Sequence, residues 1–186
     1  MPDGSRVAAL RADLTRWAPA DPAQGALRDE YLDFVATGSL DRGYGPQHVT
    51  ASCFVLSPDR TRVLLCFHRK GQFWVQLGGH IEPGDPTVAA AALREAVEEG
   101  GIAGLAPVGS VPFDVDRHGL GDGFGACAVH WDVGYVAIAP SDAVPAASDE
   151  SEEVAWWPVD ALPANVPPDS RRGWPGYWSS WLPAVS

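Results

Sequence analysis

Basic residues are few in this 186-residue chain: 13 lysines and arginines stand against 24 aspartates and glutamates, and the formal net charge is −11. Proteins that bind duplex nucleic acid or anionic lipid need a basic surface. The charge balance therefore argues against duplex nucleic acid and a membrane surface as partners. It is compatible with a small nucleotide that binds together with a divalent cation, because the cation supplies positive charge.

Cysteine is also scarce, and the long hydrophobic runs of membrane proteins are missing. Cys53, Cys66 and Cys127 are widely spaced and form no CxxC pair, so the sequence shows no zinc-binding pattern and we expect buried free thiols. The apolar runs are the length of strands, well below the roughly 20 residues of a membrane span, and no export signal is apparent. We therefore expect a soluble, cytoplasmic protein with one main core.

The pattern of apolar residues changes near residue 46. In residues 1–46, apolar side chains recur at helical spacing, which predicts an N-terminal helical extension. Residues 47–186 predict a domain of short strands around one central helix, followed by a tryptophan-rich C-terminal segment. The predicted strands cover residues 50–56, 62–67, 73–77, 111–115, 128–139 and 154–157.

The central helix is predicted over residues 88–99. Gly78-Gly79 begins a loop rich in glycine and proline, and Thr87 then precedes a run of good helix formers. Gly100-Gly101 ends the helix, because glycine favours the backbone conformation of a helix C-terminus.

This helix carries three glutamates in its last turns, where the negative end of the helix dipole disfavours each anion by roughly 0.3–1 kcal/mol. Glu95 lies three and four residues before Glu98 and Glu99, so carboxylates share one helix face and repel each other. Arg94 is expected to compensate only Glu98, four residues later. Two explanations remain open: a solvated acidic surface, and a site for a hard divalent cation such as Mg²⁺.

The surrounding residues closely resemble the signature of the Nudix hydrolases, Gly-x5-Glu-x7-Arg-Glu-U-x-Glu-Glu-x-Gly-U, in which U is aliphatic. The chain has Gly79-x5-Asp85-x8-Arg94-Glu95-Ala96-x-Glu98-Glu99-x-Gly101-Ile102. Asp85 replaces the first glutamate, and one extra residue lies between it and Arg94. A subgroup of the family resembles this chain further, since it has the same extra residue and the loop Gly-Gly-His-x-Glu-Pro-Gly-Asp, here residues 78–85.

The resemblance implies an α/β fold, the Nudix α/β/α sandwich around a mixed β-sheet. It also implies a hydrolase that cleaves the pyrophosphate bond of a nucleoside diphosphate derivative or nucleoside triphosphate, with water attacking phosphorus and Mg²⁺, or Mn²⁺, as cofactor. By position, Glu98 and Glu99 are expected metal ligands. Glu95 is a third ligand or orients the water, and Arg94 braces the carboxylates unless it forms only an ordinary surface ion pair.

Further metal ligands are expected from a later acidic segment. Residues 148–153 resemble the glutamate-rich segment before a late strand from which the family often recruits another carboxylate. Glu152 and Glu153 are therefore candidate metal ligands. A solvated acidic loop remains the alternative.

Candidate substrate-binding residues lie in three places. Arg69 follows the second strand and has the geometry to pair with a phosphate. Gly78, Gly79 and His80 precede the helix of the signature. A polar cluster on two neighbouring strands is a candidate for substrate binding or a second metal, unless it faces solvent; its members are Asp116, His118, His130 and Asp132.

Two other functions remain as alternatives. A non-catalytic, nucleotide-binding Nudix module is disfavoured because such modules tend to lose the glutamate pair. An isopentenyl-diphosphate isomerase needs a catalytic cysteine, and Cys53 and Cys66 instead lie among apolar residues. The N-terminal extension and the C-terminal segment are candidates for shaping the pocket or a homodimer surface, and the sequence does not identify the substrate.

Overall fold

The computed structural model describes residues 3–37, 40, 43, 45–120, 127–148 and 151–167. These residues form one eight-stranded sheet and three helices, α1 (Asp3–Arg16), α2 (Pro22–Thr37) and α3 (Val88–Gly100). The strands are β1 (Gln47–Leu56), β2 (Arg62–His68), β3 (Phe73–Val75), β4 (Leu77–His80), β5 (Ala106–Pro107), β6 (Asp114–Gly119), β7 (Val129–Ile138) and β8 (Ser151–Pro158). None of the described helices is long and apolar enough to cross a membrane.

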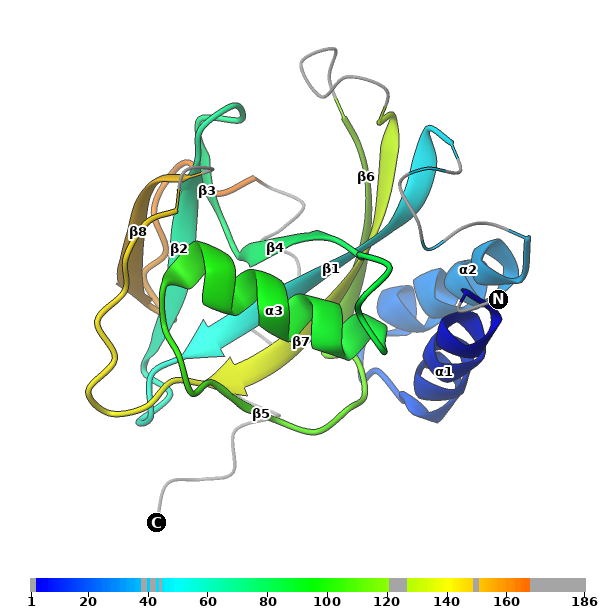
Figure 1. Ribbon diagram of the computed structural model, residues 1–186, viewed down its shortest axis with the longest axis horizontal. Helices are drawn as coiled ribbons and strands as arrows, with labels where there is room; N and C mark the ends of the chain where they lie inside the picture. Colours follow the sequence, from blue (N-terminus) through cyan, green and yellow to red (C-terminus); the bar gives the residue numbers. More distant parts are fainter. Residues whose placement is uncertain are drawn as a thin grey trace.

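The sheet is mixed and is built around the parallel pair of β1 and β7, which runs from Gln47↔Val129 to Leu56↔Ile138. The other edge of β1 is divided between two antiparallel partners, β4 along its middle and β2 at its end. β6 continues the sheet beyond β7, and β8 pairs with β2. Figure 1 shows α3 lying across β1 and β7, with α1 and α2 at one end and β8 at the other.

Side-chain alternation along β1 produces two hydrophobic clusters, one on each face of the sheet. Val49, Ala51 and Cys53 belong to the larger cluster, which also contains the buried face of α3. Phe54 and Leu56 belong to the smaller cluster, together with residues of β2 and β8. The core therefore consists of two layers that share β1.

The N-terminal helices pack on the larger cluster. Leu10 and Leu14 of α1 and Tyr31 and Val35 of α2 are buried in the same cluster as α3. The predicted helices in residues 1–46 are therefore confirmed. The division of the chain at residue 46 stays a prediction, and the C-terminal tryptophans beyond residue 167 lie outside the described residues.

The ends of α3 confirm both predicted caps. The Thr87 hydroxyl accepts a hydrogen bond from the Ala90 N–H at 3.1 Å, and Thr87 has the extended backbone of an N-cap. Gly101 has a left-handed backbone with φ of 65°, and its N–H donates to the Val97 carbonyl. These two residues define where the helix begins and ends.

The prediction for residues 73–77 is wrong, because this segment forms two short strands instead of one. β4 includes Gly78 and Gly79, which were predicted to begin a loop. A Cβ atom on Gly78 would lie 2.6 Å from the Ala51 carbonyl oxygen and 2.6 Å from the Ser52 Cα atom. The absence of a side chain therefore lets β4 pair closely with β1.

Two further strands differ from the prediction. β6 begins at Asp114 instead of residue 111 and continues to Gly119, which places Asp116 and His118 inside a strand. β5 was not predicted, because it contains only two residues and is too short to show a sequence pattern.

Replacing Gly78 by alanine should lower the free energy of unfolding by about 1–3 kcal/mol, because the added methyl group would separate β4 from β1. Gly25 in α2 is a matched control, since a Cβ atom there meets nothing within 4 Å. Gly25→Ala should raise stability by about 0.5–1 kcal/mol. Urea unfolding of both variants measures the effect, and equal or greater stability of Gly78→Ala would contradict the close approach.

Candidate active site

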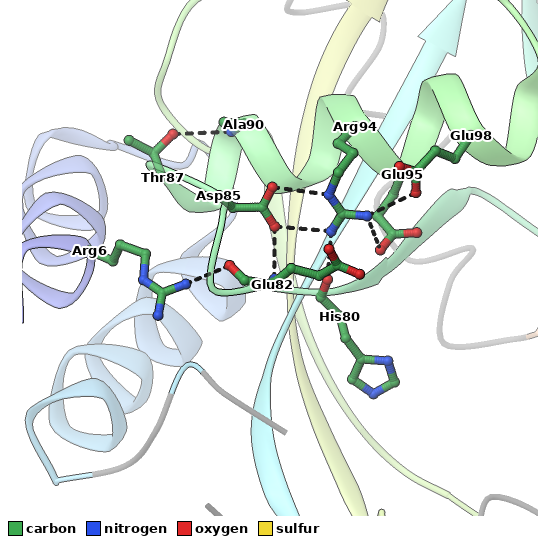
Figure 2. Close-up of polar contacts among 9 residues, drawn as sticks. All are labelled: Arg6, His80, Glu82, Asp85, Thr87, Ala90, Arg94, Glu95 and Glu98. Carbon is green, nitrogen blue, oxygen red and sulfur yellow. Dashed lines mark hydrogen bonds and ion pairs between the residues drawn. The ribbon is translucent and has the colours of Figure 1, made fainter. Parts of the chain in front are cut away.

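The guanidinium of Arg94 lies at the centre of the candidate site (Figure 2). Its Nε and Nη2 atoms donate to the two carboxylate oxygens of Asp85, each at 3.0 Å. Nη1 donates to Glu95 at 3.0 Å and to Glu98 at 2.9 Å. Nη2 also donates to the His80 carbonyl at 2.9 Å. One side chain therefore joins the end of β4, the following loop and two glutamates of α3.

The expectation that Arg94 compensates only Glu98 is wrong. The helix period correctly identifies Glu98, four residues away, but Asp85 and His80 come from the loop and strand before the helix. Asp85, which stands where the Nudix signature has glutamate, still offers a carboxylate, and this carboxylate forms a bidentate pair with the arginine of the signature.

The electrostatics of this pair favour the charged forms. Burial by itself would raise the pKa of Asp85, but hydrogen bonds from Arg94 and from the Glu82 N–H, together with the charge of Arg94, lower it below the usual value. The same hydrogen bonds and the nearby Glu95 raise the pKa of Arg94. Both groups therefore remain ionised at neutral pH.

The three glutamates of α3 differ in exposure. Glu98 has a 57% exposed side chain, whereas the Glu95 side chain is 14% exposed. Glu99 is buried, and one of its oxygens accepts a hydrogen bond from the Gly78 N–H at 2.8 Å. A Cβ atom on Gly79 would lie 2.7 Å from the Glu95 carboxylate. Gly79 therefore allows β4 to lie directly against the acidic face of the helix, and the Gly78 N–H binds that face through Glu99.

These carboxylates form a donor set that suits Mg²⁺, since magnesium prefers oxygen ligands and binds to proteins through a few carboxylates. Glu98 is open to solvent, and Glu99 lies beside it and binds the Gly78 N–H through one carboxylate oxygen. Glu95, Glu98 and Glu99 are the residues that would hold the ion.

The loop before α3 is held from two sides (Figure 2). The Glu82 N–H donates to Asp85 at 2.8 Å, and Arg6 of α1 donates from Nη1 to the Glu82 carbonyl at 2.7 Å. Arg6 is 5% exposed, so α1 packs closely against this loop. α1 thus contacts the loop of the candidate site. From the sequence, the N-terminal extension was a candidate for shaping the pocket, but Arg6 was not identified.

Three other predicted residues lie along β2 and β8. Arg69 is exposed after β2, with Nη2 3.5 Å from the Ser151 carbonyl. Glu152 accepts a hydrogen bond from Gln72 at 3.0 Å, and Glu153 is exposed opposite Phe67. Their roles in phosphate and metal binding stay predictions.

The polar cluster on β6 and β7 is brought together as predicted. Asp116 pairs with Asp132, and His118 with His130, in the antiparallel register. His118 Nδ1 lies 2.8 Å from Asp116 Oδ2. The solvent-facing alternative is wrong for Asp132, which is 7% exposed.

The buried Asp132 carboxylate is anchored to β1. It accepts hydrogen bonds from Thr50 at 2.8 Å and from Ser52 at 2.5 Å. Burial raises the pKa of Asp132, although these hydrogen bonds oppose the increase. The polar cluster therefore extends across β7 onto β1.

Two residues beside this cluster were not identified from the sequence. His48 and Cys127 lie with His80 and His130 in one group whose ligand atoms are all within 4.8 Å of one another. The sequence shows no zinc motif because these residues come from separate parts of the chain. The sequence does contain one histidine in each of three strands that pair in the structure. Recognising that these histidines meet requires the register of the strands, which the sequence does not give.

Residues 46–181 match the family model described as NUDIX domain. The chain belongs to the Nudix domain family. The predicted Nudix fold is confirmed, with a mixed, curled sheet, flanking helices and helices at the N-terminus. Members of this family that are hydrolases generally cleave pyrophosphate bonds and depend on Mg²⁺.

Solved structures of Nudix proteins are similar to this chain. A Nudix hydrolase from M. smegmatis, RenU, is 20% identical, with a TM-score of 0.55 over 75% of this chain and 89% of that chain. MutT protein from Methanosarcina mazei Go1 is 18% identical, with a TM-score of 0.51 over 65% and 88%. A Nudix family hydrolase from Clostridium perfringens is 26% identical, with a TM-score of 0.49 over 61% and 82%. A comparison with curated proteins gives no match.

The Asp85–Arg94 pair of this Nudix domain predicts a defined pH dependence. Because the pKa of Asp85 is lowered in the folded state, its contribution is complete above the unfolded value of about 3.9 and is lost as pH falls through the folded value. Asp85→Asn should therefore lower stability by roughly 1–3 kcal/mol at pH 7, and the difference from wild type should shrink below about pH 4.

Urea unfolding at several pH values tests this expectation. Asp142→Asn is the control, because Asp142 is an exposed turn residue and its replacement should change stability by less than about 0.5 kcal/mol. A difference between Asp85→Asn and wild type that is independent of pH down to the acid limit would contradict the assigned ion pair.

Proposed function

We propose that this Nudix domain is a Mg²⁺-dependent pyrophosphohydrolase of a nucleoside diphosphate derivative or nucleoside triphosphate. The observation that carries the proposal is the arrangement of Glu95 and Glu98 on one guanidinium, beside the buried Glu99. Three carboxylates are thereby concentrated on one helix face next to a glycine-lined strand. Arg94 offsets part of this negative charge, and a divalent cation would neutralise the remainder.

Each glutamate has a distinct part in this proposal. The bound cation would neutralise phosphate oxygens and activate the pyrophosphate bond towards water. Glu98 and Glu99 would be ligands, one at the exposed surface and one at β4. Glu95, fixed by Arg94 and covered by Gly79, would be a third ligand or would hold and orient the water.

The geometry supports Arg94 as a positioning residue. Its hydrogen bonds restrict the side chains of Glu95 and Glu98 and tie them to the loop through Asp85. Catalytic groups need this kind of restriction, because a misplacement of about 1 Å can cost roughly 100-fold in rate. We include Arg94 in the catalytic site on this basis.

The substrate would bind near the ends of β4, β6 and β7. Gly78 and Gly79 allow the close approach of β4, and His80 would contribute through its backbone at the end of this strand. Asp116, His118 and Asp132 would supply polar groups on the neighbouring strands. We also propose Arg69 for phosphate binding and Glu152 and Glu153 as further metal ligands. A cytoplasmic location, a homodimer and membership of the subgroup with the extra residue belong to the same proposal.

The isomerase alternative is weakened by the state of the cysteines. Cys53 and Cys66 are each 1% exposed, and burial raises the pKa of both thiols to about 12. A thiol of this kind is not ionised at neutral pH and is not accessible to a substrate.

Glu98→Gln should reduce kcat/KM by about 100-fold or more, because it removes an oxygen ligand and its charge while keeping the shape of the side chain. The assay measures phosphate or nucleotide release from nucleoside triphosphates, ADP-ribose, nucleotide sugars, dinucleoside polyphosphates and isopentenyl diphosphate, with Mg²⁺ or Mn²⁺ and with chelator.

Glu30→Gln is the matched control, since Glu30 is an exposed glutamate of α2 that pairs with Arg117. This variant should keep wild-type activity. Turnover that survives in Glu98→Gln, or nucleotide binding without any turnover in the wild type, would replace the hydrolase by the non-catalytic binding module. Conversion of isopentenyl diphosphate to its allylic isomer without phosphate release, followed by NMR, would support the isomerase.

A further inference from the structure

A second group of metal-ligating side chains lies outside the glutamates of α3. It consists of His48 on β1, His80 at the end of β4, His130 on β7 and Cys127 two residues before β7. One ligand atom from each residue lies within 4.8 Å of the ligand atoms of the other three. His48 is completely buried and Cys127 is 8% exposed, whereas His80 and His130 are half-buried.

The register of three strands assembles the histidines. His48 lies opposite His130 in the parallel pair of β1 and β7. His80 lies opposite Thr50, which is two residues beyond His48 and therefore on the same face of β1. The ring centroids of His48 are 5.0 Å from those of His80 and of His130, and the latter two are 5.4 Å apart. The three imidazoles thus form a compact triangle beside Cys127.

We propose that these four residues bind a structural Zn²⁺ ion. Three imidazole nitrogens and one thiolate are the ligand types that zinc prefers, and four protein ligands complete its tetrahedral shell. With Zn–N distances of about 2.0–2.1 Å and a Zn–S distance of about 2.3 Å, ligand atoms lie roughly 3.3–3.8 Å apart. Small side-chain movements, of about an ångström, convert the observed group into such a shell.

This donor set differs from the glutamates of α3 in kind. The proposed zinc ligands include no oxygen, whereas Glu95, Glu98 and Glu99 offer only oxygen. Hard Mg²⁺ and borderline Zn²⁺ therefore prefer different places in the same domain. Because the zinc shell is filled by protein, its role is structural instead of catalytic.

His80 connects the two sites. Its backbone carbonyl accepts a hydrogen bond from Arg94 at 2.9 Å, while its ring points away from Arg94 (Figure 2). The ring centroid lies 5.0 Å from that of His48 and 5.4 Å from that of His130. The preceding residue, Gly79, lies against Glu95. A bound zinc ion would fix β4 to β1 and β7 and thereby hold the carbonyl that Arg94 uses.

The first measurement is the metal content of tag-free, full-length protein, followed by titration of the metal-stripped protein with Co²⁺. We expect one zinc per chain, and one equivalent of cobalt with tetrahedral visible bands and a thiolate-to-cobalt charge-transfer band. Cys127→Ser should abolish the charge-transfer band and weaken zinc binding by at least about 100-fold. Zinc should raise the Tm of wild type more than that of the variant.

Cys66→Ala is the matched control, because Cys66 is a buried thiol outside the group. It should keep the charge-transfer band, and circular dichroism confirms that each variant is folded. His130→Gln is the second ligand variant, and it should shift the visible bands and weaken zinc binding. A folded wild type without the charge-transfer band, or a band that survives in Cys127→Ser, overturns the proposal.

These measurements do not depend on hydrolysis. Glu98→Gln should keep the cobalt charge-transfer band even though it is expected to lose activity. Cobalt d–d bands in the wild type without the charge-transfer band, and lost in Glu98→Gln, would place the cobalt at the glutamates and would overturn the zinc site. A failed activity assay with an intact band would overturn only the proposed hydrolase.

Discussion

The candidate site depends on the interaction of the positively charged Arg94 side chain with the carboxylates around it. α3 carries three glutamates at the end where the helix dipole opposes negative charge. Arg94 makes five hydrogen bonds, to Asp85, Glu95, Glu98 and the His80 carbonyl, so a single guanidinium offsets much of this cost. The same bonds order the loop. The same hydrogen bonds therefore both compensate the negative charge of the glutamates and fix the positions of their side chains.

Local features of the fold were predictable from the sequence. The caps of α3 depend on Thr87 and Gly101 alone, and the hairpin of β1 and β2 depends on a short turn between apolar segments. The Nudix signature is likewise contained in one loop and one helix. The glutamates and Arg94 could therefore be found without knowledge of the tertiary structure, although their exposure could not.

Features that depend on strand pairing were not predictable. The division of residues 73–77 follows from the way β1 shares one edge between β2 and β4. The group containing His48 and Cys127 exists only because the registers of β1, β4 and β7 align. Alternation along β4 then places Gly79 against Glu95 and the His80 ring among the histidines. A short strand would thus separate the two proposed metal sites by one peptide unit.

The hydrogen bond from Arg6 to the Glu82 carbonyl joins positions 76 residues apart. Since α1 contributes this buried cation to the loop before α3, order in the loop and order in α1 are thermodynamically linked. Any ligand that binds only the ordered loop must also stabilise the docked helix, by the same factor with which the docked helix favours the ligand. The N-terminal segment is therefore an energetic partner of the site, and hydrogen exchange in α1 reports events at the acidic face of α3.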